Sequence, residues 1–140
     1  MKSKQVLDVQ QMQHLQELGL KLKHSLVHYY KIINIDSGKW YLSVTIGDIS
    51  EDSPTYQYIP AYTLQDVLDA LPKDISKDGC TWYASLYIDF ENNRISYGNT
   101  DRYGFEIYHE IMIEKDLIDA AYSMLCWAID NKFVETNKNK

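Results

Sequence analysis

The part of the sequence that most constrains the fold is residues 117–131, where apolar side chains recur at helical spacing. On a helix at about 100° per residue, the polar residues fall into one narrow stripe. The stripe holds Asp119, Ser123, Cys126 and Asp130, while Leu117, Ile118, Ala121, Met124, Leu125, Ala128 and Ile129 cover the opposite side. Because a surface helix usually has an apolar stripe little more than about 100° wide, this helix must be covered on more than one side. We therefore expect a central, largely buried C-terminal helix that begins after Asp116, with Leu125 and Ile129 packed against a sheet.

Two further helices are predicted earlier in the chain. Asp8 is a suitable N-cap for a short amphipathic helix that ends at Gly19, and its glutamine-rich side is expected to face water. The segment Thr63-Leu-Gln-Asp66 predicts a second helix start, because a threonine N-cap with an acid three residues later forms a capping box. Tyr62 is placed to pack onto Val67 at this start.

The remaining patterns predict strands. Alternating or β-branched segments occur at 25–35, 40–46, 56–59, 82–90, 95–97 and 105–113, and residues 25–28 are also compatible with a helix. A loop is expected at 73–79, and turns are expected at 91–94 and 98–104. Since the strands are grouped between helices, we predict an α+β fold. It consists of a mostly antiparallel sheet of about five strands with three helices.

Each of three strands is predicted to turn one apolar register toward the core. These registers are Trp40, Leu42, Val44 and Ile46; Trp82, Ala84, Leu86, Ile88 and Phe90; and Phe105, Ile107, His109, Ile111 and Ile113. Successive side chains of a strand point to opposite faces, so the residues between them are expected on the other face.

Length and charge restrict the class of protein. A chain of 140 residues is most simply one domain, 1–140, with frayed tails at 1–7 and 134–140. A net charge of −6 argues against a large contact with nucleic acid, and 20 acids offset by 14 basic residues make a DNA mimic a weak alternative. No apolar stretch is long enough to span a membrane, and the two cysteines fit no ligand spacing. We expect a cytoplasmic protein with reduced cysteines.

Candidate catalytic and metal-binding residues are few. His24 and His28 are four residues apart, but no third ligand lies at a recognised offset, and we predict neither a metal nor another cofactor. Acidic residues cluster at 48–52 and 89–91 without the spacing of a calcium loop. An alternative function is a small hydrolase or metal-dependent enzyme that uses these loop carboxylates with His109 or His28.

Tyrosine is unusually frequent, with 12 in the chain. Tyr41, Tyr83, Tyr87 and Tyr108 alternate with the apolar registers of their strands, so they are predicted to share one face of the sheet. Tyrosine supplies a large contact area with little loss of entropy, which suits a recognition surface. We interpret these four residues as a surface that binds a protein partner or a second copy; the alternative is that the same face lies under a helix.

Three stretches together resemble small uncharacterised phage or prophage proteins of gut Bacteroides-type bacteria. They are Met12-Gln-His-Leu-Gln-Glu-Leu-Gly19, Pro60-Ala-Tyr-Thr-Leu-Gln-Asp-Val-Leu-Asp-Ala-Leu-Pro72 and Leu117-Ile-Asp-Ala-Ala-Tyr-Ser-Met-Leu-Cys-Trp-Ala-Ile-Asp-Asn131. The resemblance implies a phage or mobile-element origin and the host cytoplasm, and it transfers no catalytic residues. The function predicted from the sequence is therefore a non-enzymatic accessory protein of a phage or mobile element.

Overall fold

The computed structural model describes residues 4–22, 27–33, 38–44, 55–76, 83–100 and 102–136. In chain order the elements are α1 (Val9–Glu17), β1 (Val27–Ile32), β2 (Tyr41–Val44), β3 (Tyr56–Pro60), α2 (Leu64–Ala70), β4 (Asp74–Ile75), β5 (Ala84–Asp89), β6 (Arg94–Thr100), β7 (Glu106–Ile113) and α3 (Leu117–Asp130). The α+β class is confirmed. No helix within these ranges has both the length and the apolar character needed to cross a membrane.

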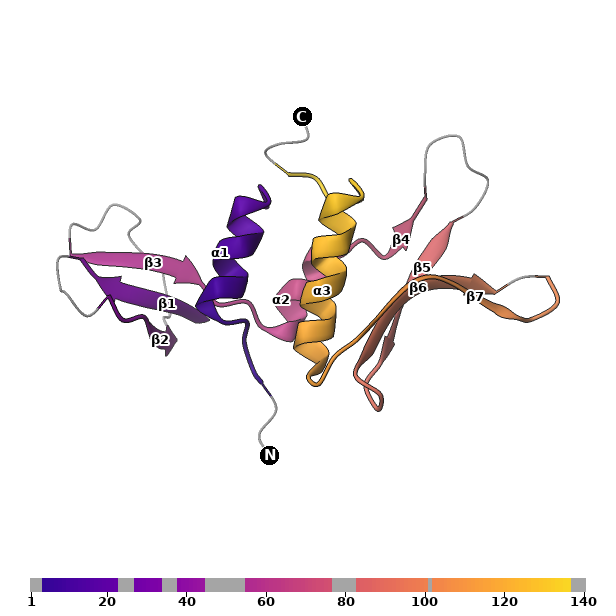
Figure 1. Ribbon diagram of the computed structural model, residues 1–140, viewed down its shortest axis with the longest axis horizontal. Coiled ribbons are helices and arrows are strands. Elements are labelled where there is room, and N and C mark those ends of the chain that lie inside the picture. Colours follow the sequence, from indigo (N-terminus) through magenta and orange to yellow (C-terminus); the bar gives the residue numbers. More distant parts are fainter. Residues whose placement is uncertain are drawn as a thin grey trace.

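The strands form two antiparallel sheets, with the helices between them. Figure 1 shows the three-stranded sheet, of order β2-β1-β3, on one side of the helices and the four-stranded sheet, of order β4-β5-β6-β7, on the other. Helix α3 contacts α2, β6 and β7, whereas α1 contacts β3. The expectation of one sheet of about five strands is therefore wrong, because alternation identifies a strand but does not say which strand it pairs with.

The capping predictions for the first two helices are confirmed. The Asp8 carboxylate accepts from the Gln11 backbone N–H at 2.8 Å, and the Gln11 side-chain oxygen accepts from the Asp8 backbone N–H at 3.0 Å. Gly19 follows the helix at φ 93°. Thr63 and Asp66 form the same reciprocal box at the start of α2. Each box satisfies backbone N–H groups that a helix start otherwise leaves without partners.

Helix α3 is the centre of the core, as expected. Its buried residues are Ile118, Ala120, Ala121, Met124, Leu125, Ala128 and Ile129. Leu125 is 0% and Ile129 4% exposed. Asp116 occupies the N-cap position but makes no capping bond with its side chain. Its carboxylate instead accepts from the Lys4 backbone N–H at 3.4 Å.

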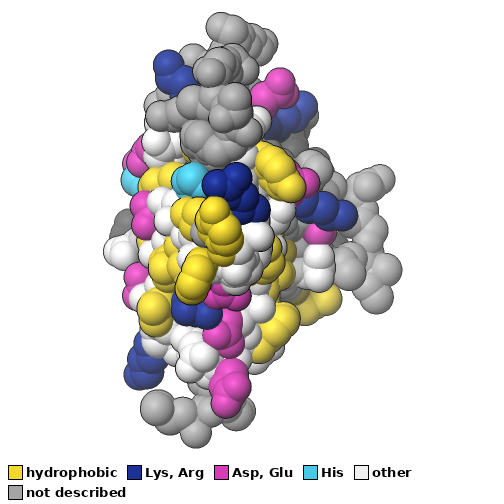
Figure 2. Space-filling view, turned by 90° about the vertical axis from the view of Figure 1, so that its right-hand side faces the viewer, with side chains coloured by type: hydrophobic (Ala, Val, Ile, Leu, Met, Phe, Trp, Pro, Cys, Tyr) yellow, Lys and Arg dark blue, Asp and Glu magenta, His cyan; other side chains and the backbone are white. Residues whose placement is uncertain are grey.

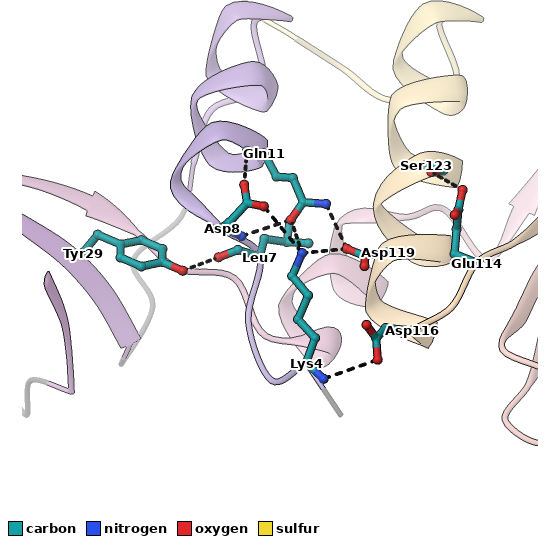
Figure 3. Close-up of polar contacts among 9 residues, drawn as sticks. All are labelled: Lys4, Leu7, Asp8, Gln11, Tyr29, Glu114, Asp116, Asp119 and Ser123. Carbon is teal, nitrogen blue, oxygen red and sulfur yellow. Dashed lines mark hydrogen bonds and ion pairs between the residues drawn. The ribbon is translucent and has the colours of Figure 1, made fainter. Parts of the chain in front are cut away.

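The segment before α1 is tied to the helices rather than frayed. The Lys4 ammonium donates to Gln11 at 2.7 Å and to Asp119 at 2.8 Å, and Gln11 donates to the same Asp119 oxygen at 2.9 Å (Figure 3). Leu7 is fully buried, and its N–H donates to the Tyr62 carbonyl. The prediction of a frayed tail is therefore wrong for residues 4–7, and Gln11 does not face water as the other glutamines of α1 do.

In the three-stranded sheet, β3 lies at one edge, and β2 does not have the expected buried register. Leu42 is 53% and Val44 68% exposed, because β2 is the opposite edge of the sheet and extends past the core. Burial on this side is instead provided by Ile59 and by Tyr29, whose hydroxyl donates to the Leu7 carbonyl at 2.8 Å.

The four-stranded sheet differs from the sequence expectation in four places, three of them in β4, β6 and the β5–β6 turn. The predicted loop after α2 contains β4, which pairs with β5, and the predicted 98–104 turn begins later because β6 continues to Thr100. Phe90 lies in the β5–β6 turn and is 67% exposed, so it does not belong to the core register. The turn itself is confirmed, with Asn93 at φ 50°.

The largest difference is a bulge in β7. Tyr97 pairs with Glu110, whereas the next residue, Gly98, pairs with Tyr108, so His109 is the extra residue of β7 at this point of the ladder. An extra residue in one strand reverses the side to which the following residues point. Ile107 and Ile111, which were predicted to share one face, therefore lie on opposite faces.

Candidate functional site

The side of the four-stranded sheet that faces away from α3 is called the outer face below. Residues opposite one another in an antiparallel ladder share a face. Ile95 and Met112 form such a pair in the core, beside α3. The intervening pairs therefore lie on the outer face: Tyr87–Ser96, Ser96–Ile111, Arg94–Ile113, Gly98–Tyr108 and Thr100–Glu106.

A groove of about 300 Å³ lies on this outer face. We call it the tyrosine groove. It is lined by Tyr87, Ile88, Asp89, Arg94, Ser96, Asn99, Thr100, Glu106 and Tyr108. Tyr87 comes from β5 and Tyr108 from β7, on either side of the small residues Ser96 and Gly98 of β6. Two aromatic rings with polar groups between them form a surface suited to binding.

Gly98 is required for the position of the Tyr108 ring. A Cβ atom on Gly98 would lie 2.6 Å from the Ile107 carbonyl oxygen and 3.0 Å from Cδ1 of Tyr108. The absence of a side chain therefore allows β7 and its tyrosine to approach β6 closely beside the bulge. Close approach of two backbones is a characteristic use of glycine inside a strand.

The charges of the groove are partly compensated within it. The Arg94 guanidinium lies 3.4 Å from the Asp89 carboxylate and 5.6 Å from the Tyr108 ring centroid. A hydrogen bond from the Asn92 side chain is the main reason that the pKa of Asp89 lies below its usual value. The Tyr108 hydroxyl donates to Glu106, and this bond raises the pKa of Tyr108. The groove thus presents neutral hydroxyls and one acid, Glu106, that makes no ion pair with a described residue.

The four predicted tyrosines are not brought together on one face. Tyr87 and Tyr108 line the groove, and Tyr83 is 62% exposed directly before β5. Tyr41 belongs to the other sheet, where its ring is 5.4 Å from that of Tyr30. The prediction of a single tyrosine face fails for Tyr41 because it assumed one sheet.

A second group of tyrosines was missed by the sequence analysis. Tyr30 lies in register between Tyr41 and Tyr58, and the rings of Tyr30 and Tyr56 are 5.9 Å apart. These residues are in strands that the sequence predicts, yet their common face depends on the pairing of β1 with both neighbours. Only that pairing could have identified them.

The residues considered for catalysis do not converge. His28 is buried in the three-stranded sheet, whereas His109 is exposed on β7 of the other sheet. The acidic segment 48–52 and His24 lie outside the described residues. Within the described ranges, no group of three His, Cys, Asp or Glu side chains is placed to hold a metal ion.

Cys126 is not activated as a nucleophile. Burial raises the pKa of its thiol, although a hydrogen bond with Tyr122 acts in the opposite direction. A thiol with a raised pKa carries little of the reactive thiolate at neutral pH. Cys126 is therefore best described as a residue that packs at the border of the core.

A larger cavity, of about 560 Å³, lies where the end of α1, α2 and residues 134–135 meet. It is lined by Leu20, Lys21, Tyr62, Asp66, Asp69, Ala70, Val134 and Glu135. Asp66 is used in capping α2, and Asp69 accepts a bond from Gln65 at 2.7 Å. This cavity therefore has fewer polar groups that could converge on a ligand than its acidic lining would indicate.

Comparisons of this chain with protein-family models, with curated proteins and with solved structures find no match. The fold and the groove define an α+β protein with exposed tyrosines on both of its sheets and a tyrosine-lined groove on the four-stranded one.

Proposed function

We propose that this chain is a non-enzymatic accessory protein that binds a protein partner through the outer face of its four-stranded sheet. The observation that supports this function is the exposure of aromatic rings on a sheet whose other face is already packed on α3. Tyr83 is 62% and Tyr87 49% exposed, although the core of the sheet is complete without them. Aromatic residues are enriched at protein interfaces and supply much of their binding energy.

The surrounding surface is consistent with an interface. Figure 2 looks onto the four-stranded-sheet side of the molecule and shows hydrophobic side chains gathered along its middle, with acidic and basic side chains around them. Exposed apolar residues of this part include Ile113 on the outer face, at 63%, and Phe105 directly before β7, at 68%. Contiguous apolar surface rimmed by polar groups is a recognised mark of an interaction site.

The resemblance to phage and prophage proteins supports a phage or mobile-element origin as part of this proposal. The expected partner is then a protein of the host cytoplasm or of the phage itself. The groove contains no arrangement of nucleophile and base, so its tyrosines are assigned to recognition rather than to catalysis.

The test combines partner capture with unfolding of matched variants. Tyr83 and Tyr87 are changed together to Ser, and Tyr41→Ser on the other sheet is the control. We expect the double variant to lose the captured partner while each change costs less than about 1 kcal/mol of stability, as surface substitutions do. Tyr41→Ser is expected to retain the partner. Unchanged capture by the double variant would contradict the proposed function, and a loss of about 3 kcal/mol or more per site would place the rings in the core.

A further inference from the structure

Among the residues that the structure describes, β7 has a neighbouring strand on one side only, so one edge of the four-stranded sheet is open. It is the last strand of the order β4-β5-β6-β7, and its eight residues, Glu106–Ile113, include neither lysine nor proline. Edge strands are commonly protected by such residues, because their unpaired backbone groups can bind another strand. Exposed aliphatic side chains also occur along this strand, at Ile107 and Ile113.

Two contacts indicate which backbone groups of β7 point away from β6. The Ile111 N–H donates to the neighbouring Glu110 carboxylate at 3.0 Å, so it is directed to the open edge. The Ile107 carbonyl lies close to Gly98 and is therefore directed toward β6. Since backbone groups alternate along a strand, Glu106 and Tyr108 point outward before the bulge, and Ile111 and Ile113 point outward after it.

We propose that the open edge of β7 pairs antiparallel with β7 of a second copy of this chain, about a two-fold axis between His109 and Glu110. In this register Tyr108 opposes the partner copy's Ile111, and Glu106 opposes its Ile113. Both pairs bring outward backbone groups together, so each pair exchanges ladder hydrogen bonds. The bulge makes this register possible. Each pair joins an odd-numbered residue to an even-numbered one, and in a regular strand two such residues point to opposite faces. Because the bulge reverses the alternation, the two members of each pair lie on the same face.

The side-chain pairs of this register are complementary. Ile107 opposes Met112 on the α3 side of the sheet, and His109 opposes Glu110 twice, once on each side of the axis. No acid opposes an acid. Glu106 opposes Ile113 in this register. A register shifted by two residues is worse, because it places both acids opposite isoleucines, Glu110 at Ile107 and Glu106 at Ile111, and leaves no acid opposite His109. The two His109–Glu110 pairs, in which a ring N–H can donate to a carboxylate, therefore favour a second copy in this one register.

Pairing would also free the Glu110 carboxylate for its new partner. In the single chain this carboxylate accepts from the Ile111 N–H. In the pair, the Ile111 N–H donates to the opposing Tyr108 carbonyl, and Glu110 is released to face the opposing His109. The exchange leaves neither the backbone donor nor the carboxylate without a partner.

The consequence goes beyond the proposed function. Two four-stranded sheets would join into one of eight strands. Because the two-fold axis is perpendicular to the sheet, both tyrosine grooves would face the same side. Such a dimer presents two binding sites in a fixed geometry, so it would bind a repetitive or dimeric target with higher avidity than a single chain.

The test is the mass in solution, measured by sedimentation and light scattering across a dilution series. Wild type is expected at twice the 16.4 kDa chain mass. His109→Glu places acids opposite acids and should raise the dissociation constant by about tenfold or more. The double variant His109→Glu with Glu110→His exchanges the two members of each pair and should restore the dimer. Leu42→Glu, on the edge of the other sheet, should leave the dimer intact.

Each outcome bears on the dimer separately from the proposed function. A wild-type chain that stays monomeric up to about 1 mM would overturn the proposal, because only a very weak contact escapes detection there. Dissociation by Leu42→Glu, or no recovery in the exchanged variant while thermal unfolding shows it folded, would overturn it too. Partner capture dependent on Tyr87 could persist in either case, so failure of the dimer leaves the proposed function standing.

Discussion

Replacing Gly98 by Ala tests whether the close approach of β6 and β7 shapes the tyrosine groove. The new Cβ would lie 2.6 Å from the Ile107 oxygen, a distance that real Cβ atoms essentially never show. Because the obstacle is backbone, the two strands must separate beside the bulge. Overpacking of this kind costs about 1–3 kcal/mol. The Tyr108 ring, 3.0 Å from the same Cβ, must move with β7.

The measurement is urea unfolding followed by tryptophan fluorescence and circular dichroism. Thr100→Ala is the matched control, because Thr100 lies on the same strand and on the groove but is exposed. The control is expected to change the free energy of unfolding by no more than about 0.5 kcal/mol, as surface substitutions do. A Gly98→Ala loss below about 0.5 kcal/mol would refute the reasoning, since the strands would then have room for a side chain.

Three further predictions follow from the core, from the Lys4 contacts and from the finding that no described residues form a metal-binding group. Leu125→Ala should cost about 2–5 kcal/mol in the same assay, because Leu125 is fully buried at the centre of α3; a loss below about 1 kcal/mol would show that the helix is not central. Partial burial raises the pKa of Asp119, but hydrogen bonds from Gln11 and Lys4 outweigh it and lower the pKa below its usual value. The stability from Asp119 is therefore present above the unfolded pKa of about 3.9 and is lost as the pH falls through the lower folded value, so Asp119→Asn should remove part of the acid destabilisation. An unchanged acid profile in that variant would contradict this assignment. Purified protein should contain no stoichiometric zinc or iron, given the described arrangement of His, Cys and acids; elemental analysis that finds one metal per chain, lost in His28→Ala, would overturn this.

The candidate site could be predicted only in part. Alternation in 82–90 places Tyr87 opposite the apolar register, and its exposure of 49% agrees with that placement. The groove itself also needs Tyr108, Ser96 and Gly98, which come together through two strand pairings. A one-residue bulge at His109 cannot be recognised from the alternation of apolar and polar residues, because it depends on which residue of β6 pairs with each residue of β7. The sequence therefore identified tyrosines but not their common surface.

The sequence by itself determined the features that depend on contacts within three or four residues. These are the capping boxes at Asp8 and Thr63, the turn at Asn93 and the apolar surface that makes α3 central. Only the tertiary structure decided how the strands divide into two sheets, and with that division Tyr41 was separated from Tyr87. It likewise decided that Lys4 would bind Asp119, 115 residues away in the chain. Local interactions depend on residues that are neighbours in the sequence, whereas the pairing of distant strands depends on the packing of the whole chain around α3.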